Sequence, residues 1–267
     1  MNRHEFLKKS MMYVGGTAAA CMLYPHKKTH AEVVPENDPR IQTEFTNYPT
    51  KNGTIRAYLA TLKTKEKRPA VIVIHENKGL QPHIQDVTRR LALEGFLAIA
   101  PDALSMVGGT PDKIDQATKL IRELDQKTTI DNFTAAVQYL KTNPLSTGKV
   151  GCIGFSWGGA MANQVAVHSP DLQAAVPYYG SQPDVDDVKK IKASLLLQYA
   201  GLDERINKGI PQYEEALKKA SINYTTHIYK GAKHAFNNDT NAERYHKDSA
   251  DLAWKRTVAF LKEKLKA

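Results

Sequence analysis

One short segment near the middle of the chain constrains the fold more than any other. Residues 149–160 read KVGCIGFSWGGA, so an apolar run meets a serine that has one glycine two positions before it and another two positions after it. A serine on a sharp turn from a strand into a helix has a strained backbone, and side chains at those two positions would clash with the turn. Gly154 and Gly158 remove these side chains. The pattern therefore predicts that Ser156 is exposed on a tight strand-to-helix turn.

The sequence around this motif decides how much weight it carries. Gly-x-Ser-x-Gly alone is a weak signal, because it arises by chance in roughly one chain in ten of this length. Residues 150–153 are typical of a buried strand and residues 160–167 of a helix, which is the context that the motif needs. A helix that begins near Trp157 would direct its N-terminal amides and the positive end of its dipole at the reacting centre. We therefore predict that Ser156 is the nucleophile of a hydrolase, with a plain glycine-rich turn as the alternative.

The overall composition is typical of a folded domain. The chain has 267 residues, 42% hydrophobic and 24% charged, which is enough to bury a sizeable core and excludes wholesale disorder. Because no stretch of about 18 apolar residues occurs, we expect no stable membrane span. The net charge is +9, of which residues 1–31 hold a net +4. The other basic residues are scattered without a nucleic-acid-binding motif, so we expect no nucleic-acid partner.

The first 31 residues have the organisation of an export signal. A basic start is followed by the largely apolar residues 11–24 and then by small residues that end at Ala31. Cleavage before Glu32 would leave residues 32–267 as a single α/β domain. We therefore expect an exported protein that resides in the periplasm.

The export route has alternatives. Residues 2–8, NRHEFLK, resemble a twin-arginine export motif with histidine in place of the second arginine, so general secretion is also open. Residues 18–21 faintly resemble a lipoprotein box that ends at Cys21, which leaves a lipid anchor open. An uncleaved N-terminal tether is a third possibility.

Strand-like and helix-like segments alternate along the rest of the chain. Residues 41–63 alternate in polarity around an Asn-Gly turn and predict a hairpin. Such alternation predicts an open, mostly parallel sheet with helices on both faces. The further predicted strands are 68–74, 96–100, 150–153, 174–180, 193–199 and 224–229, and the predicted helices are 84–94, 112–126, 130–142, 160–167 and 242–264.

A serine nucleophile needs a histidine base and a carboxylate that orients the histidine. In this fold class they follow the serine in the order acid, then histidine. His234 lies in a loop just past the carboxyl end of a predicted strand, where catalytic groups gather in open α/β sheets. His227 and His246 also follow the serine at a distance, but they lie in a predicted strand and in the terminal helix. We therefore predict that His234 is the base.

The acid is expected at the end of a strand between the serine and the histidine. Asp203 follows the apolar run 193–199 and is our choice, with Glu204 as the nearest competitor and a loop-capping role for Asp203 as the structural alternative. For the oxyanion we predict two backbone amide donors, those of Trp157 and Asn77. No second histidine follows His75 at helical spacing, so we expect no metal site.

Taken together, several motifs resemble the dienelactone hydrolase family of α/β-hydrolases, also called carboxymethylenebutenolidases. The resemblance extends from about Ile41 to Lys264 and implies an α/β-hydrolase fold that hydrolyses an ester or lactone without a cofactor. The motifs that carry it are His75-Glu76 before Gly79-Leu80, Gly95-Phe96 before Pro101-Asp102, the Gly148–Gly159 segment, and Gly231–Phe236 around His234.

The chain also departs from this family. Family enzymes that open dienelactone have a cysteine where this chain has Ser156, and the glutamate that matches Glu76 interacts with that cysteine at rest. They bind the substrate carboxylate with arginines at positions that match Met106 and Asn238. The resemblance thus makes Glu76, Met106 and Asn238 candidate substrate-binding residues. Because both arginines are missing, we expect Met106 and Leu104 to form an apolar wall and short neutral esters to be preferred over a carboxylated lactone.

The sequence therefore predicts an exported serine esterase or lactonase that acts on a small molecule, as a monomer or small homo-oligomer. An acyltransferase or a peptidase could use the same three residues with another acceptor or leaving group. A non-catalytic binding protein on a hydrolase scaffold is the alternative from a different functional class.

Overall fold

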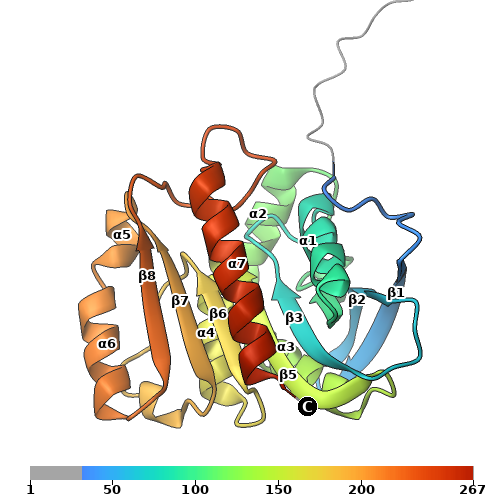
Figure 1. Cartoon of the computed structure of the whole chain (residues 1–267), viewed down its shortest axis with the longest axis horizontal. Helices are drawn as coiled ribbons and strands as arrows, with labels where there is room; N and C mark the ends of the chain where they lie inside the picture. Colours follow the sequence, from blue (N-terminus) through green and yellow to red (C-terminus); the bar gives the residue numbers. More distant parts are fainter. Residues whose placement is uncertain (1–31, 267) are drawn as a thin grey trace, which may run out of the picture. The chain divides into compact units, whose positions relative to one another are not determined.

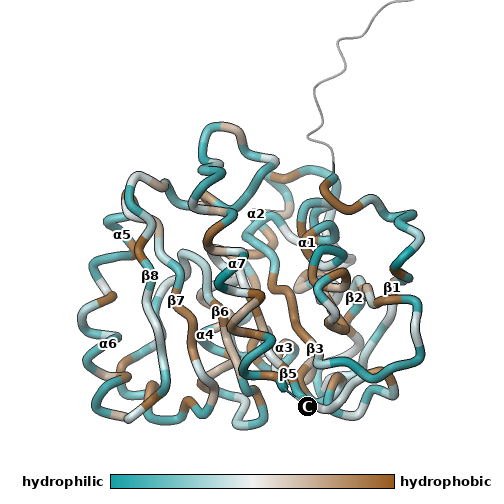
Figure 2. Tube along the Cα trace, viewed as in Figure 1, coloured by the Kyte–Doolittle hydropathy of each residue, from teal (hydrophilic) through white to brown (hydrophobic). Residues whose placement is uncertain are grey.

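A run of branched apolar residues forms the strand at the centre of the sheet. The computed structural model describes residues 32–266, and the predicted export segment lies outside them. β3 (Arg68–Ile74) pairs in parallel with β4 (Leu97–Pro101) on one side and with β5 (Ser146–Phe155) on the other. Side chains 70–74 are fully buried, because both faces of this strand are covered by helices. Most of this strand is accordingly coloured as hydrophobic in Figure 2.

The remaining strands extend the sheet on either side. The eight strands lie in the order β1-β2-β4-β3-β5-β6-β7-β8. β1 and β2 form the predicted antiparallel hairpin, and β2 pairs antiparallel with β4, while all pairs from β4 to β8 are parallel. The strands not yet given are β1 (Ile41–Thr50), β2 (Gly53–Leu62), β6 (Ala174–Tyr178), β7 (Ser194–Ala200) and β8 (Tyr224–Tyr229).

Helices cover both faces, so the predicted doubly wound α/β fold is confirmed. α1 and α7 pack over one face, which Figure 1 shows in front, and the other helices build the core on the opposite face. Two short 3-10 helices, η1 (Ser105–Val107) and η2 (Val188–Lys190), lie in the connections. The α-helices are α1 (Pro82–Leu93), α2 (Ile114–Glu123), α3 (Gln126–Thr142), α4 (Trp157–His168), α5 (Glu204–Asn207), α6 (Ile210–Lys219) and α7 (Lys247–Lys264).

Among the helix boundaries that differ from the sequence prediction, capping explains the starts of α3 and α7. α3 begins at Gln126, before the predicted start, because the Asp125 carboxylate accepts a hydrogen bond from the amide of Thr128 at 2.8 Å. α7 begins at Lys247 and not near residue 242, because His246 caps it through the amide of Ser249. Residues 235–246 are thereby left as a long loop after His234.

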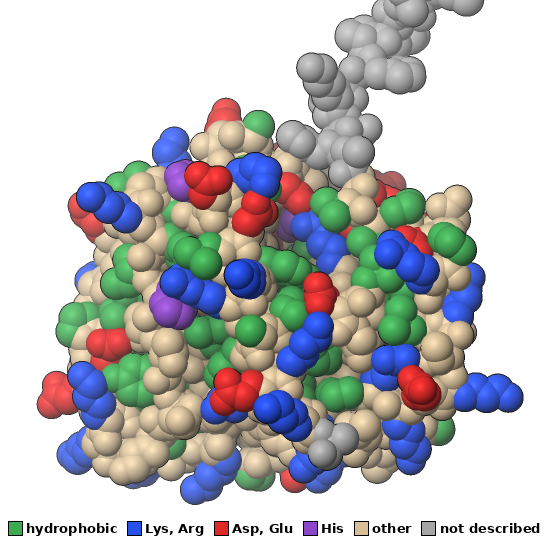
Figure 3. Space-filling model, in the orientation of Figure 1, with side chains coloured by type: hydrophobic (Ala, Val, Ile, Leu, Met, Phe, Trp, Pro, Cys, Tyr) green, Lys and Arg blue, Asp and Glu red, His purple; other side chains and the backbone are tan. Residues whose placement is uncertain are grey.

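The described surface carries charges of both signs. Figure 3 shows acidic and basic side chains interspersed over the face that carries α1 and α7. Within residues 32–266, no helix has the length and apolar character needed to cross a membrane.

The turn between β5 and α4 is held by close backbone contacts. Ser156 has φ 55° and ψ −112°, a strained conformation for a residue with a side chain. Its amide donates to the carbonyl of Tyr178 at 3.0 Å. A Cβ added to Gly154 would lie 2.0 Å from the carbonyl oxygen of Gly158, and one added to Gly158 would lie 2.3 Å from that of Ile74. These contacts confirm that the turn requires glycine at both positions.

This packing makes the Gly158→Ala variant a test of the turn. Because the added methyl group would meet backbone atoms that cannot move independently, we expect the free energy of unfolding to fall by about 3 kcal/mol or more. Urea denaturation followed by circular dichroism measures the change. Gly231→Asn is the control, because Gly231 has φ 76° with no atom within 4 Å of the added Cβ, and asparagine tolerates that conformation. Equal losses in the two variants would contradict this account of the turn.

Candidate active site

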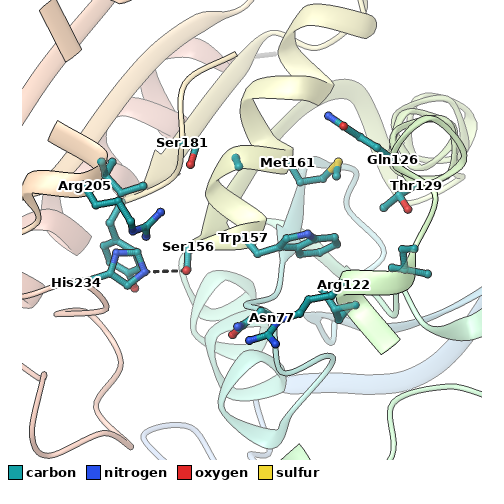
Figure 4. A pocket seen from close by; sticks show the side chains of 15 residues that line it. Asn77, Arg122, Gln126, Thr129, Ser156, Trp157, Met161, Ser181, Arg205 and His234 are labelled. Atoms are coloured by element: carbon teal, nitrogen blue, oxygen red, sulfur yellow. Dashed lines mark hydrogen bonds between the residues drawn. The ribbon is translucent and has the colours of Figure 1, made fainter. Parts of the chain in front are cut away.

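Three loops at the carboxyl edge of the sheet bring Ser156, Asp203 and His234 together. Ser156 follows β5, Asp203 follows β7 and His234 follows β8. The Ser156 hydroxyl oxygen lies 2.8 Å from Nε2 of His234, which the dashed line in Figure 4 marks. Nδ1 of His234 lies 2.5 Å from Oδ2 of Asp203. The three predicted side chains thus form one hydrogen-bonded chain from a carboxylate to a serine hydroxyl.

Asp203 has a structural role as well as its contact with histidine. Its side chain is buried and caps α5, since Oδ1 accepts from the amide of Ile206 at 3.4 Å. Oδ2 remains for His234, so the two sequence interpretations of Asp203 are compatible. Glu204, the competing acid, is exposed on the first turn of α5.

A buried tyrosine that the sequence analysis missed packs against the histidine. The rings of Tyr179 and His234 have centroids 5.0 Å apart, and Tyr179 has φ 39° at the end of β6. The Tyr179 amide donates to the carbonyl of Gln198 at 2.7 Å, which fixes this turn to β7. Burial raises the pKa of the Tyr179 phenol, so this group stays neutral at physiological pH. In the sequence, the Tyr-Tyr-Gly segment at the end of a predicted strand could have indicated that Tyr179 lies at the site.

His75 fixes the loop that carries the second predicted oxyanion donor. Its ring is fully buried, Nδ1 lies 2.7 Å from the carbonyl oxygen of Glu76, and Nε2 accepts from the amide of Ala103 at 3.2 Å. Burial lowers the pKa of His75, so the ring is neutral with its proton on Nδ1. The Trp157 indole stacks on it with centroids 5.4 Å apart. His75 therefore packs against Trp157 and also fixes the loop that carries Asn77.

A cleft opens in front of Ser156 and has two lobes. The tryptophan lobe, of about 420 Å³, and the polar lobe, of about 450 Å³, share Asn77, Ser156, Arg205 and His234. Figure 4 views the tryptophan lobe, with Trp157 at its centre. The other residues of the tryptophan lobe are Ile121, Arg122, Leu124, Gln126, Thr129, Trp157, Ala160, Met161, Tyr179, Ser181 and Ile206. Those of the polar lobe are Glu76, Lys78, Ala235, Asn241, Glu243 and Arg244.

The prediction that Met106 lines the substrate cavity is wrong. Met106 lies on η1, is 44% exposed, and has its sulfur 3.6 Å from Nδ2 of Asn132. It belongs to neither lobe, because the chain after β4 turns toward the β1–β2 hairpin, where a Cβ on Gly53 would lie 3.1 Å from the Met106 methyl group. Leu104 is fully buried in the core. The expected apolar wall from these two side chains is therefore absent from the two lobes.

Asn238 contacts Glu76 and lines neither lobe. Its Nδ2 donates to Oε2 of Glu76 at 3.0 Å, and its Oδ1 accepts from the amide and hydroxyl of Thr240 at 3.0 and 2.6 Å. Both Asn238 and Glu76 are buried, and Glu76 lines the polar lobe. Of the three residues predicted to bind substrate, only Glu76 is thus placed at the cleft.

Two arginines that sequence reasoning missed line the tryptophan lobe. Arg122 lies in the last turn of α2 and Arg205 lies in α5, and Figure 4 shows both guanidinium groups directed into the cavity near Ser156. Neither forms an ion pair with another residue in the part of the chain that the structure describes. The argument that a substrate carboxylate would meet no cation in this cleft therefore does not hold. The position of Arg205, two residues after Asp203, was the available signal.

The family model described as "Dienelactone hydrolase family" matches residues 55–265. The chain belongs to this family. Members of this family are α/β-hydrolases that act on ester or lactone bonds. The predicted family and enzyme class are therefore confirmed. The resemblance drawn from the sequence motifs extends over nearly the same residues.

Individual relatives agree with this assignment. An Escherichia coli O157:H7 protein named "Putative carboxymethylenebutenolidase" is 32% identical over 86% of this chain and 90% of its own length. "Protein usf" of Aquifex pyrophilus is 36% identical over 80% of this chain and 96% of its own length. A crystal structure titled "Putative Dienelactone Hydrolase" from Klebsiella pneumoniae superposes with a TM-score of 0.76 at 30% identity, covering 84% of this chain and 99% of that one.

An ionic network anchors the loop that follows His234. Asp239 lies 2.7 Å from Nη2 of Arg90 and 3.1 Å from Nδ1 of His83, and Arg90 also contacts Asp86 in the same helix, α1. Burial by itself would raise the pKa of the Asp239 carboxyl, but the close contacts with His83 and Arg90 lower it to about 2. The network therefore ties residues 235–246 to α1.

We expect Asp239→Asn to lower the free energy of unfolding at pH 7 by about 1–2 kcal/mol. An unfolded aspartate has a pKa of about 3.9, so this contribution is present above about pH 4 and is lost as the pH falls toward 2. Urea denaturation at pH 7, 4 and 3 measures it. Asp251→Asn is the control, because Asp251 pairs with Lys247 on the surface and is 58% exposed. A pH-independent difference between wild type and Asp239→Asn would contradict the role of this ion pair.

Proposed function

We propose that this family member is a serine esterase or lactonase in which Ser156 is the nucleophile, His234 the general base and Asp203 the orienting acid. The observation that carries the proposal is the hydrogen-bonded chain Asp203–His234–Ser156 in front of a cleft. Family membership supports ester or lactone bonds as the target.

The proposed reaction follows from the positions of the protons. Nδ1 of His234 donates to Asp203, so Nε2 is free to accept the Ser156 proton as the hydroxyl oxygen attacks the ester carbonyl. The negative charge then develops on the carbonyl oxygen. The backbone amides of Trp157 and Asn77 lie at the cleft and form no hydrogen bond within residues 32–266, which leaves them to bind the oxyanion.

The later steps of the proposed reaction use His234 first as a general acid and then again as a base. His234 gives its proton to the leaving alcohol, which leaves an acyl group on Ser156. A water molecule, deprotonated by His234, then attacks the acyl carbon, the bond to the Ser156 oxygen breaks, and His234 returns the proton to that oxygen as the acid leaves. An acyltransferase would replace this water with an alcohol or amine, and a peptidase would release an amine, so product analysis distinguishes these alternatives. The non-catalytic alternative predicts no turnover.

Single substitutions test the roles of the three residues. We expect Ser156→Ala and His234→Ala to lower kcat on p-nitrophenyl butyrate by about 10⁴-fold or more, because each removes the nucleophile or the base. Asp203→Ala is expected to retain more activity than either, since the histidine keeps its other contacts. Circular dichroism checks that each variant is folded. Full activity in any of the three folded variants removes that residue from the proposed mechanism.

We also propose that the protein is exported to the periplasm, on the basis of the charge and hydropathy pattern of residues 1–31. The full-length chain expressed in a bacterium is expected to yield a periplasmic product shortened by about thirty residues. Cell fractionation and N-terminal mass spectrometry measure this. An unprocessed cytoplasmic product would contradict the proposal, and a lipid-modified product that begins at Cys21 would identify a membrane anchor instead.

A further inference from the structure

The two lobes of the cleft both contain His234 but are lined by different segments of the chain. The tryptophan lobe is lined by the start of α4, with Trp157, Ala160 and Met161. The polar lobe is lined by the segment that contains His234 and continues to Arg244. The leaving oxygen of an ester must lie within hydrogen-bond distance of Nε2 of His234, because it receives the proton from that atom. His234 lines both lobes, but the residues that follow it in the chain line only the polar lobe, so we place the leaving alcohol in the polar lobe and the acyl group in the tryptophan lobe.

The lining of the polar lobe restricts the charge of that alcohol. Its lining residues include the cationic residues Lys78, Arg205 and Arg244 and the anionic residues Glu76 and Glu243. A charged alcohol of either sign would meet groups of its own charge as well as opposite ones: an anionic alcohol would meet the two carboxylates, and a cationic alcohol the three cations. An apolar alcohol would displace water from these groups and leave them without partners, which is costly. Hydroxyl groups both donate and accept, so an uncharged alcohol with several hydroxyls can satisfy both kinds of group.

Glu76 is a buried hydrogen-bond acceptor whose orientation in this lobe is fixed by a neighbouring side chain. It is 7% exposed, and Asn238 holds one of its carboxylate oxygens, Oε2, at 3.0 Å. The other oxygen, Oε1, accepts no hydrogen bond from residues 32–266 and is not fully enclosed. Because Glu76 lines the lobe, Oε1 is available to a bound molecule there. A carboxylate fixed in this way is an oriented acceptor for a substrate hydroxyl. This gives a role to a glutamate that the serine mechanism does not use.

We propose that the polar lobe binds an uncharged polyhydroxylated leaving alcohol, with Glu76 accepting a hydrogen bond from one of its hydroxyls and Asn238 positioning Glu76. The inference rests on the proposed function, since it needs His234 to give the proton to the leaving alcohol. It assigns esters of polyols, with a compact acyl group, as the substrate class.

The test compares four esters that share the butyryl group. They are glycerol 1-monobutyrate, n-propyl butyrate, butyrylcholine and 3-butyryloxypropanoate, whose alcohols are polyhydroxylated, apolar, cationic and anionic. We expect kcat/KM for glycerol 1-monobutyrate to exceed that for each of the others by about tenfold. A higher value for any of the other three overturns the inference.

Two variants test Glu76 by the ratio of kcat/KM for glycerol 1-monobutyrate to that for n-propyl butyrate. Glu76→Gln replaces one carboxylate oxygen with a donor, and Asn238→Ala removes the group that orients the carboxylate. Both are expected to lower the ratio below about threefold, whereas a purely structural defect would lower both values equally. The double variant Glu215→Ala/Lys218→Ala, on the exposed side of α6, is the control and is expected to leave the ratio unchanged.

The outcomes separate this inference from the proposed function. Turnover of p-nitrophenyl butyrate without preference for the glycerol ester, or an unchanged ratio in folded Glu76→Gln, overturns the inference and leaves the serine mechanism intact. Absence of turnover on every ester, including p-nitrophenyl butyrate, contradicts both.

Discussion

The close backbone packing around Ser156 is the constraint on which the rest of the site depends. The strained turn is stable only because Gly154 and Gly158 let β5, α4 and the end of β3 approach to within contact of one another. The same approach brings the start of α4 and the loop after β3 to the cleft that Ser156 lines. The proposed oxyanion donors and nucleophile thus depend on one packing arrangement, and the free energy that holds the strain comes from the buried parallel strands on either side.

The groups around the serine are themselves fixed by second contacts that are not part of the chemistry. Asp203 caps a short helix while it contacts the histidine, and His75 joins its loop to the chain after β4 while it supports Trp157. The loop after His234 is tied to α1 through Asp239. Each such contact limits the conformations of a group in or beside the proposed proton-transfer chain. The geometry of that chain is therefore set before substrate binds, and little entropy is lost during the reaction.

The sequence predicted those parts of the site that depend on local pattern and topology. Ser156 follows from its glycines, and Asp203 and His234 follow from the rule that loops after parallel strands meet at one edge of the sheet. Sequence reasoning failed for Met106 because the direction of a short connection after β4 depends on its packing against the hairpin, which no local pattern encodes. Arg122 of the tryptophan lobe was missed for a related reason, since an exposed arginine on a helix has the same sequence signal whether it faces solvent or a cleft.

The central claim is that Ser156 is made nucleophilic by His234, and covalent labelling tests it most directly. A fluorophosphonate reacts only with a serine that is activated in this way, and peptide mass spectrometry locates the adduct. With the chain from Glu32 onward, the account predicts one adduct, on the peptide that contains Ser156, and its loss in Ser156→Ala. Equal labelling of wild type and Ser156→Ala, or an adduct on another serine, would contradict the account.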